Sequence, residues 1–168
     1  MGPGHLGVGF AAKAAAPKAP LWSLLVASEA LDLLSGVFIA AGTERMAVSE
    51  MSFREGVQIL APGSIPWSHG LFMAVVWSLL FGAAALWGTR DRRAAITIGL
   101  VVFSHWVLDF LVHTPDLPLL FAGSPEVGLG LWGSGTGIMI SLVLEILLLA
   151  GGVAVYIRWK KKVRRDYE

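Results

Sequence analysis

The chain has 168 residues, of which 55% are hydrophobic and only 15% are charged, and its net charge at pH 7 is +1. Soluble domains are usually less apolar and more charged, so this composition, with a mean hydropathy of +0.69, indicates a protein that resides in a lipid bilayer. The absence of cysteine excludes disulfides, thiolate metal sites and cysteine nucleophiles, which leaves His, Asp and Glu as the strong metal ligands.

The first segment, 4–16, is rich in small residues and too short to cross a membrane, so it predicts a half-helix. Lys13 and Lys18 follow its apolar part instead of preceding it, which is not the pattern of a cleaved signal peptide. If this half-helix enters the membrane from the side of its lysines, a rise of about 1.5 Å per residue places His5 inside the bilayer.

Four later segments are apolar and long enough to cross about 30 Å of hydrocarbon. They are 21–42, 68–88, 94–113 and 135–158. Tryptophans that favour the headgroup zone stand at or beside the ends of these segments: Trp22, Trp67, Trp87, Trp132 and Trp159. The sequence therefore predicts a single all-α membrane domain over 1–168, with four transmembrane helices and a short N-terminal half-helix.

Basic residues gather in two places, at 90–93 between the second and third spans and at 158–165 after the fourth. By the positive-inside rule both are cytoplasmic, together with the tail 159–168, whereas the loops 43–67 and 114–134 face outward. The basic tail is interpreted as an anchor on anionic lipid, because no nucleic-acid-binding pattern surrounds it. The bilayer is the expected partner, and an oligomer or a larger membrane complex stays open.

The third span carries ionisable residues at intervals of four, which are costly inside a membrane. His105 and Asp109 share one helix face, and His113 lies about 80° around the helix from His105. Helix arithmetic brings Asp32 to an overlapping depth, and His69 opens the second span from the same side. We expect a metal site with five ligands: His5, Asp32, His69, His105 and Asp109.

Other ionisable residues lie near the expected site: Glu29, His113, Asp116 and Glu145. The ligand types suit zinc, manganese or iron, and a bound cation would offset the cost of burying the aspartates. Taken singly, an intramembrane histidine is more often a helix-to-helix hydrogen bonder, and Glu29 or Glu145 is compatible with a packed, protonated acid. His113 and Asp116 fit simple solvation at the interface equally well. The glycines at 2, 4, 7 and 9 indicate close helix packing and not a phosphate loop.

With these residues in view, the chain resembles the YdjM-like family of bacterial inner-membrane proteins, described as membrane-bound metal-dependent hydrolases. Gly4-His5 is similar to the family's Gly-His, Asp32 lies in the place of its acidic motif, and Ser68-His69-Gly70 is similar to its Thr-His-Ser. Ser104-His105, followed by Asp109 and by Thr114-Pro115, is similar to its Leu-Ser-His and the residues after it. The chain departs from the family at Leu34 and Ser35, where the family usually has a second Asp and a His.

The resemblance implies a divalent metal, with zinc favoured by the likeness to zinc-dependent phospholipase C enzymes, held by the five expected ligands. It also implies location in the bacterial cytoplasmic membrane, with the site opening outward. The expected function is hydrolysis of a lipid or lipid-linked ester or phosphoester near the outer leaflet, with Glu29, Asp116 or His113 as catalytic groups and the loop 114–134 over the substrate. The alternatives are transport of a metal ion or proton and a non-catalytic subunit of a membrane complex.

Overall fold

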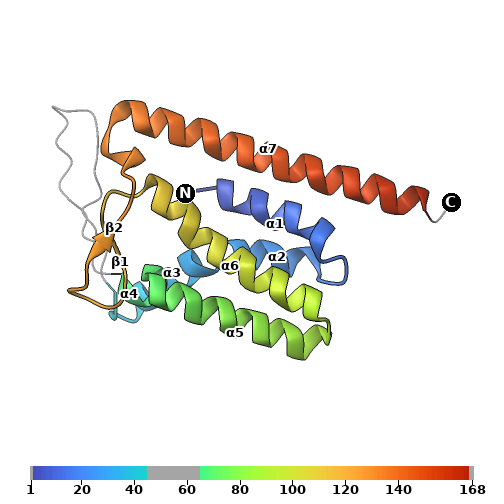
Figure 1. The fold of residues 1–168 in the computed structure, drawn as a ribbon, viewed down its shortest axis with the longest axis horizontal. Helices are drawn as coiled ribbons and strands as arrows, with labels where there is room; N and C mark the ends of the chain where they lie inside the picture. Colours follow the sequence, from blue (N-terminus) through green and yellow to red (C-terminus); the bar gives the residue numbers. More distant parts are fainter. Residues whose placement is uncertain (1, 45–64, 167–168) are drawn as a thin grey trace.

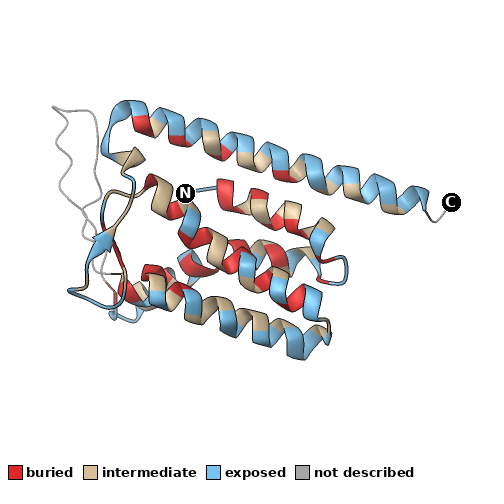
Figure 2. Ribbon diagram, in the orientation of Figure 1, coloured by how far each residue is buried: buried red, intermediate tan, exposed pale blue. Residues whose placement is uncertain are grey.

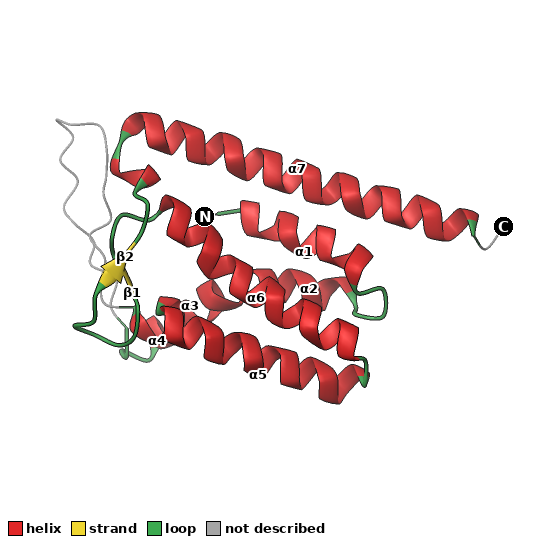
Figure 3. Cartoon of the chain, viewed as in Figure 1, coloured by secondary structure: helices red, strands yellow, loops and turns green. Residues whose placement is uncertain are grey.

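A computed structural model describes residues 2–44 and 65–166, and this part of the chain is mostly helical (Figures 1 and 3). The helices are α1 (Gly4–Ala15), α2 (Leu21–Ser28), α3 (Ala30–Ala40), α4 (Pro66–His69), α5 (Leu71–Thr89), α6 (Arg92–Val112) and α7 (Gly135–Arg165), with a 3₁₀ turn η1 (Leu131–Gly133). Two short strands, β1 (Leu117–Pro118) and β2 (Glu126–Val127), pair antiparallel, with Leu117 opposite Val127.

Three of these helices, α5, α6 and α7, are long and apolar enough to cross a membrane. The predicted span 21–42 is instead two helices, α2 and α3, which meet at a 59° bend. Only as a pair are they long and apolar enough to cross a membrane. The predicted span 68–88 is also interrupted, because Gly70 separates α4 from α5. Most of the predicted loop 43–67 lies outside the described residues, and α7 continues as a helix to Arg165 through much of the predicted tail.

Helix α6 is the central element. In an apolar stretch of 18 residues, 44% of the residues of α6 are buried, against 6% in α5 and 17% in α7. The two outer helices therefore turn most of their surface outward (Figure 2). Glycines allow α5 and α6 to approach closely, since a Cβ at Gly99 would lie 2.9 Å from the carbonyl oxygen of Ser78. The site described below is carried mainly by this central helix.

The half-helix α1 lies between α7 and the α2–α6 layer (Figure 1). A Cβ at Gly7 would collide with the backbone of Leu148, and a Cβ at Gly152 would collide with the carbonyl of Gly7. On its other face a Cβ at Gly9 would lie 2.9 Å from the carbonyl oxygen of Leu24 and 3.0 Å from Ser28 Oγ in α2. The small residues of α1 therefore serve close helix packing, as the sequence indicates, and they hold His5 against α6.

One end of the molecule collects the basic segments. Lys18, after α1, pairs at 3.0 Å with Asp91, which also caps α6 by accepting from the N–H of Ala94. The hydrogen bond from Ala94 and, to a smaller extent, the pairing with Lys18 hold the pKa of Asp91 below its usual value. Lys13 lies 5.3 Å from the ring centre of Trp159 in α7. The two basic clusters and the lysines of the first segment thus lie at one end, and the β1–β2 hairpin lies at the other (Figure 1).

The segment after α6 is more ordered than a Gly- and Pro-rich loop suggests. Leu129 N–H donates to the carbonyl of Phe110 and Gly130 N–H to that of His113, while Phe72 N–H donates to Leu119. The hairpin and η1 therefore fold back over the end of α6 and the start of α5.

Candidate metal centre

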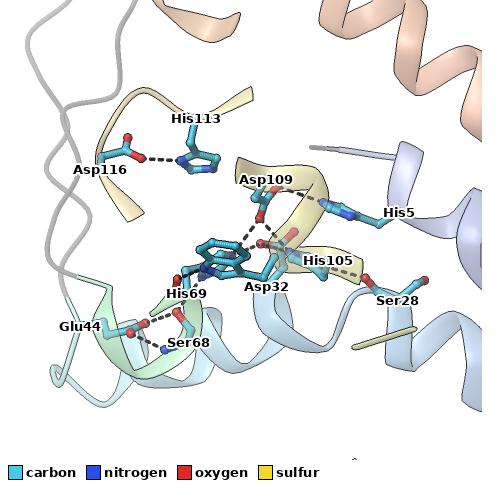
Figure 4. Close-up of polar contacts among 11 residues, drawn as sticks. His5, Ser28, Asp32, Glu44, Ser68, His69, His105, Asp109, His113 and Asp116 are labelled. Atoms are coloured by element: carbon cyan, nitrogen blue, oxygen red, sulfur yellow. Dashed lines mark hydrogen bonds and ion pairs between the residues drawn. The ribbon is translucent and has the colours of Figure 1, made fainter. Parts of the chain in front are cut away.

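Four of the five expected ligands converge on one point of the structure. Asp32 of α3, His69 of α4, and His105 and Asp109 of α6 each offer one ligand atom, and these atoms all lie within 4.8 Å of one another (Figure 4). The four residues come from three helices that are distant in sequence. This group, the four-residue centre, is able to hold a metal ion.

The separations fit a tetrahedral cation. His69 Nε2 lies 3.2 Å from Asp32 Oδ1 and 3.5 Å from one Asp109 oxygen, and His105 Nε2 lies 3.5 Å and 3.1 Å from the same two oxygens. Ligands that bind zinc at about 2.1 Å in a tetrahedron stand about 3.4 Å apart. Four of the six edges of such a tetrahedron are therefore already in place.

His105 is oriented as a metal ligand. Its Nδ1 lies 2.7 Å from the carbonyl oxygen of Ser28, which can only accept, so Nδ1 carries a proton and Nε2, which faces the centre, is the nitrogen that can bind a metal. The acceptor is available where the chain bends between α2 and α3. The His105 side chain is fully buried, and within the part of the chain that the structure describes its Nε2 has no hydrogen bond of adequate geometry. A cation between this nitrogen and the carboxylates of Asp109 and Asp32, which lie 3.1 and 3.5 Å from it, would satisfy all three groups.

His69 is held through side chains instead. Its Nδ1 lies 2.8 Å from Ser68 Oγ, and Ser68 Oγ lies 2.8 Å from Glu44 Oε2. Sequence reasoning missed Glu44, whose loop position suggests a solvated residue, although it is 2% exposed. The serine directly beside His69 was the only signal in the sequence for a supporting partner.

His5, the fifth expected ligand, lies next to the four-residue centre but outside it. Its Nε2 is 3.2 Å from Asp109 Oδ1, whereas His69 and His105 face Asp109 Oδ2. Its ring stacks on that of His105 with centres 3.7 Å apart and planes 5° apart. The structure thus brings His5 to the ligands, where it supports Asp109 and His105.

The centre has one open side. The side chains of His69, His105 and Asp109 are almost completely buried, but 53% of the Asp32 side chain is exposed. Glu29, one turn before Asp32, is half-buried at the bend, and its Oε1 has no hydrogen-bond partner among the described residues. An unsatisfied carboxylate oxygen near an open ligand is a candidate proton acceptor.

The other predicted residues lie farther out. His113 Nδ1 is 2.9 Å from Asp116 Oδ1, and Thr114 Oγ1 donates to the second oxygen of Asp116, one turn beyond Asp109 (Figure 4). The His113 ring packs on Trp132, so the pair is a built element and not a freely solvated one. Glu145 is buried in α7 against the start of α1, where Cβ atoms at Gly2 and Gly4 would contact it, and it faces the half-helix instead of the centre.

A scan of protein-family models and searches of curated proteins and of solved structures returned no match to this chain.

Proposed function

We propose that this protein is a membrane-embedded, metal-dependent hydrolase of a lipid or lipid-linked ester or phosphoester. The observation that carries the proposal is the convergence of two imidazoles and two carboxylates on one point, three of them buried and one open to the surroundings. Four protein ligands fill a zinc tetrahedron, so water or substrate would bind as a fifth ligand, the expansion that catalytic zinc sites undergo during reaction. The open side at Asp32 supports the catalytic interpretation.

The surroundings of the opening support a lipid substrate. Leu33 and Val37 follow Asp32 in α3, and they are 54% and 63% exposed. In a bilayer these side chains contact acyl chains, so a lipid can bring its head group to Asp32 while its chains stay in an apolar environment. A water-soluble substrate would gain nothing from this apolar border.

The residues of the site divide the chemical work. When bound, a divalent cation lowers the pKa of a water molecule and polarises a carbonyl or phosphoryl oxygen. His69, His105, Asp32 and Asp109 would hold it, and the Ser28 carbonyl keeps the His105 lone pair aimed inward. Glu29 would accept a proton from the attacking water while the water oxygen bonds to the carbon or phosphorus of the ester. It would return this proton to the alcohol oxygen as the bond between that oxygen and the carbon or phosphorus breaks.

Transport through the same centre has less support. The buried face of α6 between the centre and the basic end is apolar, with Ala94, Ala95, Ile98, Val101 and Val102. An ion or proton path needs polar groups on both sides of a central site. This face of α6 supports a site reached from one side only.

The proposal extends to family and topology. The residues that carry the resemblance to YdjM-like proteins on α3, α4 and α6 are those of the four-residue centre, and we propose membership of that family and zinc as the metal. The bent α2–α3 pair would serve as a fourth span. The basic end and the C-terminus would face the cytoplasm of a bacterial inner membrane, and the centre would open toward the outer leaflet.

Metal removal gives the direct test. Protein purified in detergent is expected to carry about one divalent ion per chain, measured by elemental analysis. Chelation should abolish its hydrolysis of a panel of lipid esters and phosphoesters, and added zinc should restore it. Absence of bound metal in protein that is supplied with zinc would overturn the proposal.

The Glu29→Gln variant separates catalysis from binding. It is expected to keep its metal, because Glu29 is not part of the four-residue centre, but to lose about 10²–10⁴-fold in kcat, the usual contribution of a general base. The measurement is the rate of lipid hydrolysis by metal-loaded protein, with Glu126→Gln, an exposed position in β2, as the matched control. If Glu29→Gln keeps full activity, the parallel variants Asp116→Asn and His113→Ala would identify the His113–Asp116 pair as the proton acceptor.

A further inference from the structure

A buried chain of hydrogen bonds leads from Glu44 to His69. Glu44 Oε1 accepts from the backbone N–H groups of Trp67 at 2.9 Å and Ser68 at 2.8 Å. Glu44 Oε2 lies 2.8 Å from Ser68 Oγ, which lies 2.8 Å from His69 Nδ1 (Figure 4). Glu44, Ser68 and His69 are 2%, 0% and 3% exposed, so water does not compete for these bonds.

The direction of the chain follows from counting protons. The Glu44 carboxylate can only accept, so Ser68 Oγ–H donates to Oε2. A hydroxyl has one proton, and that of Ser68 is already donated to Glu44, so Ser68 Oγ accepts from His69 Nδ1–H. In the neutral ring His69 Nε2 then carries the lone pair, and it is the atom that faces Asp32 and Asp109.

We infer that Glu44 is a positioning residue that, through Ser68, fixes the tautomer of His69 required for metal binding. This inference rests on the proposed metal-dependent function. It also explains how two helices of the centre are joined. Glu44 follows α3, with its N–H bonded to the carbonyl of Phe38, so the helix that carries Asp32 also fixes the short helix that carries His69.

The isosteric variant Glu44→Gln tests the direction of the chain without changing its shape. The two backbone N–H groups require an acceptor, so the amide oxygen must take the place of Oε1 and the NH₂ group that of Oε2. The NH₂ group then donates to Ser68 Oγ, and Ser68 Oγ–H donates to His69 Nδ1. His69 would carry its proton on Nε2, pointing into the centre.

Two readouts follow, one of which needs no metal. In chelated protein labelled with ¹⁵N-histidine, at a pH alkaline enough for the ring to be neutral, NMR should show His69 protonated at Nδ1 in the parent protein and at Nε2 in Glu44→Gln. Zinc affinity should fall about 10- to 100-fold in Glu44→Gln, as is usual when the supporting partner of a ligand is lost. Ser68→Ala, which removes the chain without reversing it, should also weaken zinc binding but leave His69 without a fixed tautomer.

The controls keep this inference separate from the proposed function. Glu126→Gln should leave both readouts unchanged, and His105 should keep its Nδ1 proton in every variant, because its partner is the backbone. Unchanged zinc affinity and an unchanged His69 tautomer in Glu44→Gln would overturn the inference while the metal site stands. If the parent protein binds no zinc but the tautomer reverses as expected, the proposed function fails and the positioning role of Glu44 is retained.

Discussion

Replacement of Asp109 by asparagine is expected to abolish metal binding by the four-residue centre and, with it, the proposed hydrolysis. Asp109 is 2% exposed and contacts three histidines, at 3.2 Å from His5, 3.5 Å from His69 and 3.1 Å from His105. Asparagine keeps the shape but loses the charge that offsets the cation in a place shielded from water. Because loss of a supporting partner alone costs 10- to 100-fold in affinity, loss of this ligand should cost more than about 100-fold.

The measurement is zinc content and zinc affinity of detergent-purified protein, with circular dichroism to show that the helices remain. Asp166→Asn is the matched control, because Asp166 is exposed at the end of α7 and should leave both quantities unchanged. His105→Ala should give the same loss as Asp109→Asn. Retention of one tightly bound zinc ion in both variants would contradict the four-residue centre.

The second large effect is expected at the contact between α1 and α7, from Gly152→Ala. A Cβ at position 152 would collide with the carbonyl of Gly7, and backbone atoms cannot rotate away as a side chain can. The helices must separate, at a cost we place near 3 kcal/mol, the upper end of the usual 1–3 kcal/mol for over-packing. Because α1 carries His5, its contact with Asp109 should lengthen as well.

The neighbouring residue supplies the control. Gly151 has nothing within 4 Å of its Cβ position, so Gly151→Ala should be neutral or should stabilise the helix by up to about 1 kcal/mol, the difference in helix propensity. The midpoint of thermal unfolding in detergent should therefore fall for Gly152→Ala, and it should stay unchanged or rise for Gly151→Ala. Equal midpoints for the two variants would mean that α1 does not pack on α7 as described.

The apolar helices were predictable because a bilayer sets both the length and the hydropathy of a spanning segment. The half-helix 4–16 was predicted because this segment is too short to cross a membrane, and α1 ends within one residue of the predicted boundary. The bend between α2 and α3 was not predictable, because neither Pro nor Gly marks the break. The β1–β2 hairpin was missed since strands of two residues leave no periodic pattern to detect.

The ligands of the centre were predictable because an ionisable residue is energetically costly inside an apolar segment. Asp32, His69, His105 and Asp109 stand out because ionisable residues in apolar segments need a partner. Helix arithmetic placed Asp32 at a depth that overlaps those of His105 and Asp109, and His69 opens the second span from the same side. The supporting groups gave no such signal. The Ser28 carbonyl is backbone, and Glu44 is 24 residues from Ser68 in a segment that is expected to be exposed.

The packing of α1 has a consequence for the order in which the protein is made. During synthesis α1 emerges before α7, yet the glycine faces of these two helices depend on each other for their closest contact. The closest packing of α1, and with it part of the support for the contact of His5 with Asp109, is therefore complete only when α7 is in place. A chain without α7 would keep the four residues of the centre on α3, α4 and α6 but would lose part of the support for His5.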